Sequence, residues 1–337
     1  MRKLIDVPVE IKTKFQPKKK LSKKLSRVYK RIGLEKKYKR VNECGNYFEY
    51  SVFSDNTANL TMCNFCKDML GPMCAWRKEL KMFNQVSKIV DVLERQKYNF
   101  VFVTLTVRNC ENDIEALKAV INEFNKAYVK LCRLQRIKRI LKGAFRAIEI
   151  TYNKQKDELH PHIHLIWVVP KGYFQSEDYL KQKELCELWK QSLGIDYTPI
   201  CDIRVVTGKK LIKDGKIVSY DLKSAVAEVC KYAIKSVDYL NNSDEVNEKV
   251  VKTLVGALAH RRLVTFYGVF AEARKQLDFD DIDDGDLLHV GDEKTNAELL
   301  YRMCFKWNNR TSTYVHTNVI INIDSLNVEL RRCNKEA

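Results

Sequence analysis

The sequence contains no long apolar run. It has 337 residues, of which 45% are hydrophobic, and its most apolar stretches, residues 100–105 and 165–169, have only the length of a strand. A membrane span needs about 18–20 consecutive apolar residues, so no transmembrane segment is predicted. The N-terminus also lacks the apolar stretch of a signal peptide. Since there is no internal repeat or low-complexity tract either, the composition fits a soluble globular protein.

Acidic residues are scarce at the start of the chain. The first 40 positions contain 16 lysines and arginines, against only Asp6, Glu10 and Glu35. Most of the net charge of +17 therefore lies in this segment. We expect residues 1–40 to form a basic N-terminal arm that is partly disordered or loosely helical. Two roles are open: binding a polyphosphate such as DNA, or keeping the protein soluble.

The eleven cysteines are odd in number, and no secretion signal accompanies them. This pattern predicts reduced thiols and a cytoplasmic protein. Cys63 and Cys66 have C-x2-C spacing, with Cys74 following and Cys44 upstream. These four thiols are candidate ligands of a structural Zn²⁺, although the spacing is less specific than a pair of CxxC motifs.

Two histidines alternate with one apolar residue in His162-Ile163-His164, at the start of a strand-like segment. On a strand both imidazoles point to the same face, about 6–7 Å apart, and can grip one metal ion. Glu149 lies in the preceding strand candidate, and antiparallel pairing would bring it level with them. Two histidines and a carboxylate suit Mn²⁺ or Mg²⁺ and would also accept Zn²⁺. The alternative is that these two histidines are ordinary polar residues on an exposed sheet face. For His160 two roles are open: a residue that supports the metal ligands or contacts DNA, or an ordinary loop histidine.

A second chemical pattern lies at residues 228–235. Helical spacing would place Glu228, Tyr232 and Lys235 on one face. A tyrosine near a cation and a metal-bound phosphate indicates phosphoryl transfer through the phenol. Alternatively, Lys235 is an exposed helix lysine, and Glu228 pairs with Lys231 or Lys235.

The apolar periodicity predicts strands interleaved with helices, and hence an α+β domain built on an antiparallel sheet. Strands are expected at residues 99–107, 144–152, 161–169, 203–206 and 216–220. Helices are expected at residues 76–96, 112–141, 179–192, 222–239, 245–258 and 260–277. The acidic residues 278–286 are expected to form a solvated loop.

The order of these motifs resembles the HUH endonucleases, in particular the replication initiators of rolling-circle plasmids of the Gram-positive type. The similar segments are a cysteine segment (residues 66–77), FVTLT (102–106), HIH (162–164), the helix carrying Tyr232, and RLVTFYG (262–268) followed by the acidic stretch. The resemblance spans roughly residues 44–289. One departure is that the family usually has a cysteine where this chain has Gly71, whereas Cys63 is additional.

The resemblance implies an HUH palm with a central antiparallel sheet flanked by helices, and Glu149 as third metal ligand. The expected parts are a basic arm (residues 1–40), a cysteine-bearing segment and helix (41–96), a nicking domain (97–277), and an acidic loop with an accessory region (278–337).

The resemblance also implies a reaction. Tyr232 would nick one strand of a plasmid double-strand origin that is single-stranded at the nick, forming a 5′-phosphotyrosine and a free 3′-OH. Glu228 would activate the water that ends the round. Host helicase, polymerase and single-strand-binding protein are the implied partners.

Two other classes are alternatives. An HUH transposase or mobilisation relaxase shares the same chemistry, but the missing second tyrosine at i+4 and the presence of Glu228 argue against it. A non-catalytic, zinc-containing DNA-binding regulator would need neither Tyr232 nor the histidine pair.

Overall fold

The structure is a computed structural model that describes residues 2–4, 6–207, 211–213, 216–231, 235–291 and 296–321. The chain forms two compact units. Unit 1 combines Met1–Lys81 with Asp281–Ala337, and unit 2 is Met82–Asp280. In each unit, helices accompany a largely antiparallel sheet, so the expected α+β class is confirmed. None of the helices in the described part of the chain is long and apolar enough to cross a membrane.

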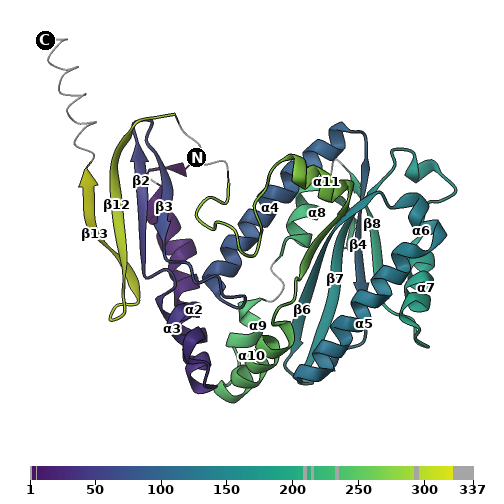
Figure 1. The fold of residues 1–337 in the computed structure, drawn as a ribbon, viewed down its shortest axis with the longest axis horizontal. Helices are drawn as coiled ribbons and strands as arrows, with labels where there is room; N and C mark the ends of the chain where they lie inside the picture. Colours follow the sequence, from purple (N-terminus) through teal and green to yellow (C-terminus); the bar gives the residue numbers. More distant parts are fainter. Residues whose placement is uncertain are drawn as a thin grey trace, which may run out of the picture. The chain divides into compact units, whose positions relative to one another are not determined.

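Unit 1 is built on a five-stranded antiparallel sheet (Figure 1). Its strand order is β1 (Arg2–Lys3), β3 (Thr57–Cys63), β2 (Tyr47–Phe53), β12 (Leu299–Asn308) and β13 (Thr313–Ile321). The pairing of β2 with β12 joins a segment from the N-terminal part of the chain and one from its C-terminal part in one sheet. We did not predict any of these strands from the sequence.

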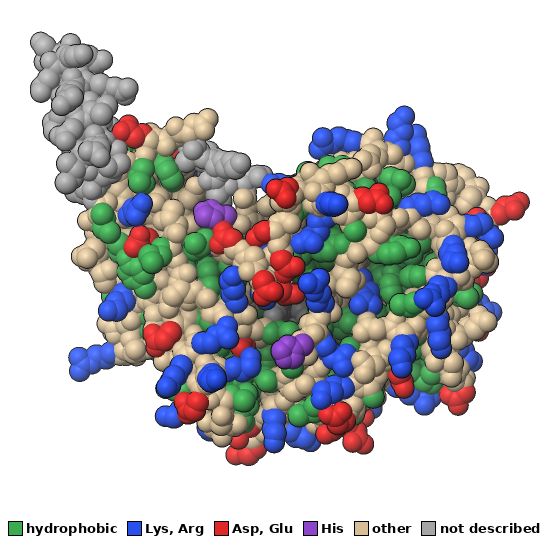
Figure 2. Space-filling view, in the orientation of Figure 1, with side chains coloured by type: hydrophobic (Ala, Val, Ile, Leu, Met, Phe, Trp, Pro, Cys, Tyr) green, Lys and Arg blue, Asp and Glu red, His purple; other side chains and the backbone are tan. Residues whose placement is uncertain are grey.

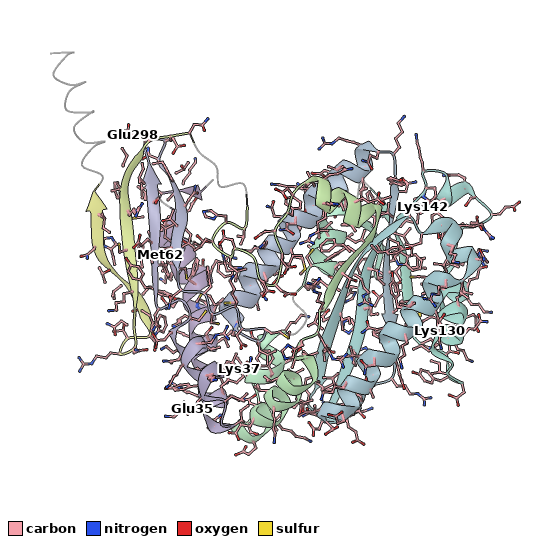
Figure 3. All side chains as sticks on the ribbon, viewed as in Figure 1. Glu35, Lys37, Met62, Lys130, Lys142 and Glu298 are labelled. Carbon is pink, nitrogen blue, oxygen red and sulfur yellow. The ribbon has the colours of Figure 1, made fainter. Side chains whose placement is uncertain are left out.

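The described residues of the basic N-terminal segment are mostly helical, which was one of the two expected states, and they pack within unit 1. It forms α1 (Asp6–Glu10), the π-helical turn η1 (Ile11–Phe15), α2 (Gln16–Arg31) and α3 (Glu35–Glu43). Phe15 is fully buried, and its ring lies 5.0 Å from the rings of both Phe48 and Trp76. Lys37, labelled in Figure 3, pairs with Asp68 at 2.7 Å. The segment thus combines a buried apolar side with a basic outer side.

The acidic segment of residues 278–286, together with Leu287 after it, is hydrogen-bonded to the first half of α4 (Pro72–Arg95). The buried Lys78 pairs with Asp283 at 3.1 Å, and the buried Lys81 donates to the carbonyl of Asp281 at 2.7 Å. Arg77, also buried, donates to the carbonyl of Leu287 at 2.8 Å. We expected a solvated loop; instead, parts of it satisfy buried cations, which are costly to leave without partners.

Unit 2 contains the larger sheet. Its strand order is β11 (Val264–Gly268), β6 (Gly143–Asn153), β7 (Glu158–Val169), β4 (Asn99–Thr106), β8 (Cys201–Thr207), β10 (Lys216–Asp221) and β9 (Leu211–Lys213), with β5 (Cys110–Glu111) beside β7. The pairs are antiparallel except β8 with β10. All five predicted strands are present.

Helices cover both faces of the unit 2 sheet. On one face, Tyr128 of α5 (Ile114–Arg133) lies under the Arg146 guanidinium, 5.4 Å from ring centroid to Cζ. On the other face, Phe145 contacts Phe270 of α11 (Val269–Gln276), with ring centroids 6.0 Å apart. The remaining helices are α6 (Gln135–Ile140), the 3-10 turn η2 (Tyr173–Gln175), α7 (Gln182–Leu193), α8 (Leu222–Val229), α9 (Ser236–Leu240) and α10 (Asp244–Leu258).

Three predicted helices are wrong in part. The helix expected over residues 112–141 is divided into α5 and α6, because Leu134 between them has extended backbone. The helix expected over residues 222–239 is interrupted, because α8 ends at Val229 and α9 begins at Ser236. The first half of the helix expected over residues 260–277 is instead strand β11, which pairs with β6 from Val264↔Ala147 to Gly268↔Gly143. The run Val-Thr-Phe-Tyr favours a strand wherever a sheet edge is free to accept it. That edge exists only in the folded sheet.

Candidate functional site

The site lies where three neighbouring strands of unit 2 meet. His162 on β7 is the register partner of Glu149 on β6 and of Thr106 on β4. His164, two residues further, is opposite Thr104 on β4. Directly opposed residues point to the same face of a sheet. The antiparallel register therefore brings Glu149, His162 and His164 onto one face.

Their side chains converge on a single point. Glu149 Oε2 is 3.1 Å from His162 Nε2 and 3.1 Å from His164 Nε2, and all three candidate ligand atoms lie within 4.8 Å of one another. Ligands about 2.1 Å from one octahedral ion stand roughly 3 Å apart when adjacent. The spacing and the donor set therefore fit a single divalent ion bound by two imidazoles and one carboxylate.

Outer hydrogen bonds orient both histidines. His164 Nδ1 lies 3.1 Å from Thr104 Oγ1, and His162 Nδ1 lies 3.3 Å from the carbonyl oxygen of His160. A partner on Nδ1 leaves Nε2 directed at the common point, which is the usual arrangement behind metal-binding histidines. His160 itself hydrogen-bonds Asn109 through Nδ1 at 2.8 Å, and its ring stacks on that of His162.

Glu149 is buried beneath the two imidazoles, with 4% of its surface exposed. Burial by itself would raise the pKa of its carboxyl group. Hydrogen bonds and charge interactions with His162 and His164 outweigh that effect, so the pKa lies well below its usual range. The carboxylate therefore remains ionised and able to bind a cation near neutral pH.

Lys235 also reaches the site, although not from the expected helix. It lies in extended backbone just before α9, with its Nζ 3.4 Å from Glu149 Oε1. Its side chain is about half exposed. The structure thus places a cation beside the candidate ligands and open to solvent. Tyr232 lies outside the described residues.

Glu228 stands apart from these ligands. It lies in the last turn of α8, and its Oε2 is 2.5 Å from Lys231 Nζ. The pairing with Lys231 that we left open from the sequence is therefore present. Among the described residues that converge as candidate metal ligands, Glu228 is not included.

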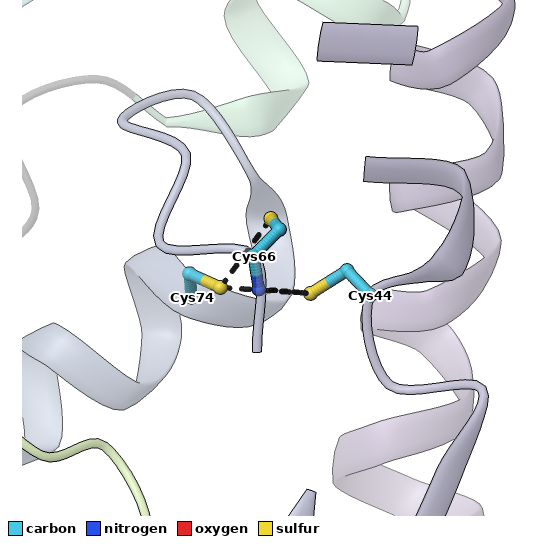
Figure 4. Close-up of side chains that lie close together, drawn as sticks. All are labelled: Cys44, Cys66 and Cys74. Atoms are coloured by element: carbon cyan, nitrogen blue, oxygen red, sulfur yellow. Dashed lines mark hydrogen bonds between the residues drawn. The ribbon is translucent and has the colours of Figure 1, made fainter. Parts of the chain in front are cut away.

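Three of the four predicted zinc cysteines converge in unit 1 (Figure 4). Cys74 Sγ lies 3.5 Å from Cys44 Sγ and 3.6 Å from Cys66 Sγ. Within the described ranges, the group that converges as candidate ligands does not include Cys63, the last residue of β3.

Two residues near the histidine site were missed from the sequence as contributors. Thr104 belongs to the FVTLT segment, but only the strand register shows that its hydroxyl faces His164. Asp238 lies in α9, and its pKa is raised by burial and by the negative charge of Glu149, against the opposing effect of Lys235. The positions of Thr104 and Asp238 along the sequence do not indicate these contacts, because each residue reaches the site from a different element.

Comparison with known proteins identifies the family. The Rep_1 family, described as replication protein, matches residues 57–315 of this chain. The chain belongs to this family. It is 33% identical over 309 residues to Protein rep of Streptococcus pneumoniae serotype 2, covering 90% of this chain and 92% of that protein. It is 37% identical over 276 residues to Protein rep of a Bacillus species, covering 79% and 89%. No solved structure matches it.

The resemblance to plasmid replication initiators is thereby confirmed. As a plasmid replication initiator, the protein has DNA as its partner. Membership of a replication protein family also favours this function over the transposase, relaxase and regulator alternatives.

The geometry predicts the effect of single substitutions on metal binding. In calorimetric titration with Mn²⁺, His162→Ala and His164→Ala should each lower the affinity at least tenfold, because each removes one of three ligands. Thr104→Val should lower it by about 10–100-fold, because it removes only the group that orients His164. His316→Ala, at an exposed histidine of β13, is the control and should bind normally. Full affinity in the His164 variant would show that these side chains do not hold the ion.

Proposed function

We propose that this replication initiator nicks one strand of plasmid origin DNA through Tyr232, at a phosphodiester held beside Glu149, His162 and His164. The observation that supports the proposal is the convergence of these three side chains, with Lys235, in a member of a replication protein family. This cleavage would take place in the cytoplasm, where plasmid DNA is replicated.

In the proposed reaction the Tyr232 phenol loses its proton, and its oxygen forms a bond to phosphorus. The bond from phosphorus to the 3′ oxygen breaks, and that oxygen takes up a proton to give the free 3′-OH. The 5′ end stays on the tyrosine, so the phosphodiester is exchanged rather than hydrolysed. The 3′-OH is then available as a primer for a host polymerase, with host helicase and single-strand-binding protein as further partners.

The protein's own groups have separate roles in this scheme. Glu149, His162 and His164 would hold a Mn²⁺ or Mg²⁺ ion, which when bound supplies Lewis-acid polarisation of the phosphate. Thr104 keeps His164 in its orientation. The ammonium group of Lys235, which is half exposed beside Glu149, would stabilise negative charge that develops on the phosphate.

Glu228 is proposed to end the reaction. A carboxylate can take a proton from water, and the resulting attack on the second phosphodiester would hydrolyse it instead of forming another adduct.

Tyr232→Phe should abolish the covalent protein–DNA adduct and leave origin binding near normal, because only the nucleophilic oxygen is lost. The measurement is adduct formation on a labelled single-stranded origin oligonucleotide with Mn²⁺, beside binding measured without metal. Tyr267→Phe, at an exposed tyrosine of β11, is the matched control and should form the adduct normally. An adduct of undiminished yield in the Tyr232 variant would refute the assignment.

Glu228→Ala should nick normally but fail to terminate, producing strands longer than one unit length on a two-origin plasmid. Lys231→Ala tests the competing explanation, because it removes the same ion pair and keeps the carboxylate. An exposed pair of this kind contributes about 0.3–0.5 kcal/mol, so both variants should fold. If Glu228→Ala and Lys231→Ala terminate replication to the same extent, Glu228 is not the general base.

The basic helices are proposed to bind DNA phosphates. Lysine and arginine side chains are spread over the visible surface (Figure 2), and Lys12, Lys14 and Lys20 are exposed. Deleting the whole segment would remove the buried Phe15 and damage unit 1, so charge substitution is the better test.

The triple variant Lys12→Ala, Lys14→Ala, Lys20→Ala should bind DNA more weakly. The slope of log affinity against log salt concentration should fall by about 0.9 for each phosphate that the protein no longer neutralises. The same three positions changed to arginine keep the charge and should keep the slope. An unchanged slope in the alanine variant would leave these lysines with a role in solubility only.

A further inference from the structure

The three convergent thiols of unit 1 have the spacing of metal ligands. Cys74 Sγ stands 3.5 Å from Cys44 Sγ and 3.6 Å from Cys66 Sγ. Sulfur atoms about 2.3 Å from one tetrahedral zinc ion are roughly 3.8 Å apart. If the three sulfur atoms move slightly apart, they therefore occupy three corners of a tetrahedral site.

Backbone N–H groups donate hydrogen bonds to all three sulfur atoms. The N–H of Cys66 donates to Cys44 Sγ at 3.4 Å, that of Lys67 donates to Cys74 Sγ at 3.2 Å, and that of Asp68 donates to Cys66 Sγ at 3.5 Å. Each sulfur thus accepts a backbone hydrogen bond, and such bonds stabilise the thiolate that a metal requires.

Buried positive charge lies beside the same group. Lys19 is fully buried, and its Nζ donates to the carbonyls of Asn42 and Cys44 at 2.9 and 2.7 Å. Three thiolates around a divalent ion carry one net negative charge, which a buried lysine would offset.

Gly71 lies beside one of the three sulfur atoms. A Cβ atom added at Gly71 would be 3.2 Å from the carbonyl oxygen of Asp68 and 3.4 Å from Cys66 Sγ, and the φ angle of this glycine lies outside the left-handed region. The backbone conformation therefore accepts a side chain here, with a shift of a few tenths of an ångström at the Asp68 carbonyl. Cys63, by contrast, is not in the convergent group, and burial raises the pKa of its thiol.

We propose that Cys44, Cys66 and Cys74 bind a thiophilic divalent cation such as Zn²⁺, with the fourth position beside Gly71 left to water. The ion would connect the end of α3, the segment after β3 and the first turn of α4, three parts of unit 1 separated along the chain. A site with one water ligand releases its metal more readily than a closed four-thiolate site.

Titration of the full-length, metal-free protein with Co²⁺ tests this proposal, because sulfur-to-cobalt charge-transfer absorption reports only thiolate ligands. Co²⁺ held by His162 and His164 does not contribute to these bands. The bands should saturate at one ion per chain and be strongly reduced in Cys74→Ser. They should be unchanged in Cys63→Ser.

Gly71→Cys is the decisive variant. It should increase the charge-transfer intensity by about one third, through a fourth thiolate, and slow the loss of metal to a chelator. Gly71→Ala adds the Cβ without the sulfur and should behave as the wild type. This gain of signal needs no destabilised variant, so it remains a test even if the serine variants do not fold.

Three results would overturn the proposal. They are Co²⁺ spectra without thiolate bands, a loss in Cys63→Ser equal to that in Cys74→Ser, or an unchanged spectrum in Gly71→Cys. None of them depends on the nicking reaction, so the two proposals succeed or fail separately.

Discussion

The pairing register of β6 against β7 is the constraint on which the histidine site depends. A shift of one residue would turn His162 and His164 to the opposite face of the sheet. That face belongs to the core: Ile163, Leu165 and Trp167 are fully buried there. Exposing these side chains would cost several kcal/mol, since each buried one contributes about 1.5–3 kcal/mol. The apolar core under α5 thus fixes the positions of the polar ligands on the other face.

Buried charge is handled differently in the two units. In unit 2, the buried Glu149 is hydrogen-bonded to the imidazoles of His162 and His164 and pairs with the ammonium group of Lys235. In unit 1, the buried Lys19 is satisfied by carbonyl oxygens beside the thiols. Both arrangements keep an ionised group away from water only where several partners surround it.

The partial failures of the sequence predictions share one cause. Apolar spacing predicted a single helix over residues 222–239, yet the chain leaves α8 after Val229 and re-enters a helix at Ser236. Lys235, just before α9, has extended backbone, and from this position its side chain contacts Glu149. Similarly, β11 forms because β6 offers a free edge. Local periodicity carries no information on such long-range partners.

The sequence by itself determined the features that depend on neighbouring residues. The alternation around His162 placed both histidines on one face, and the five apolar runs of unit 2 predicted its strands, because a strand's period of two is local. Only the tertiary structure decided which distant groups join them. It selected Thr104 behind His164, grouped Cys44 with Cys66 and Cys74 but not Cys63, and brought segments from the N-terminal and C-terminal parts of the chain into one sheet. These contacts join segments far apart in the sequence, and it is strand pairing and burial that bring such segments together.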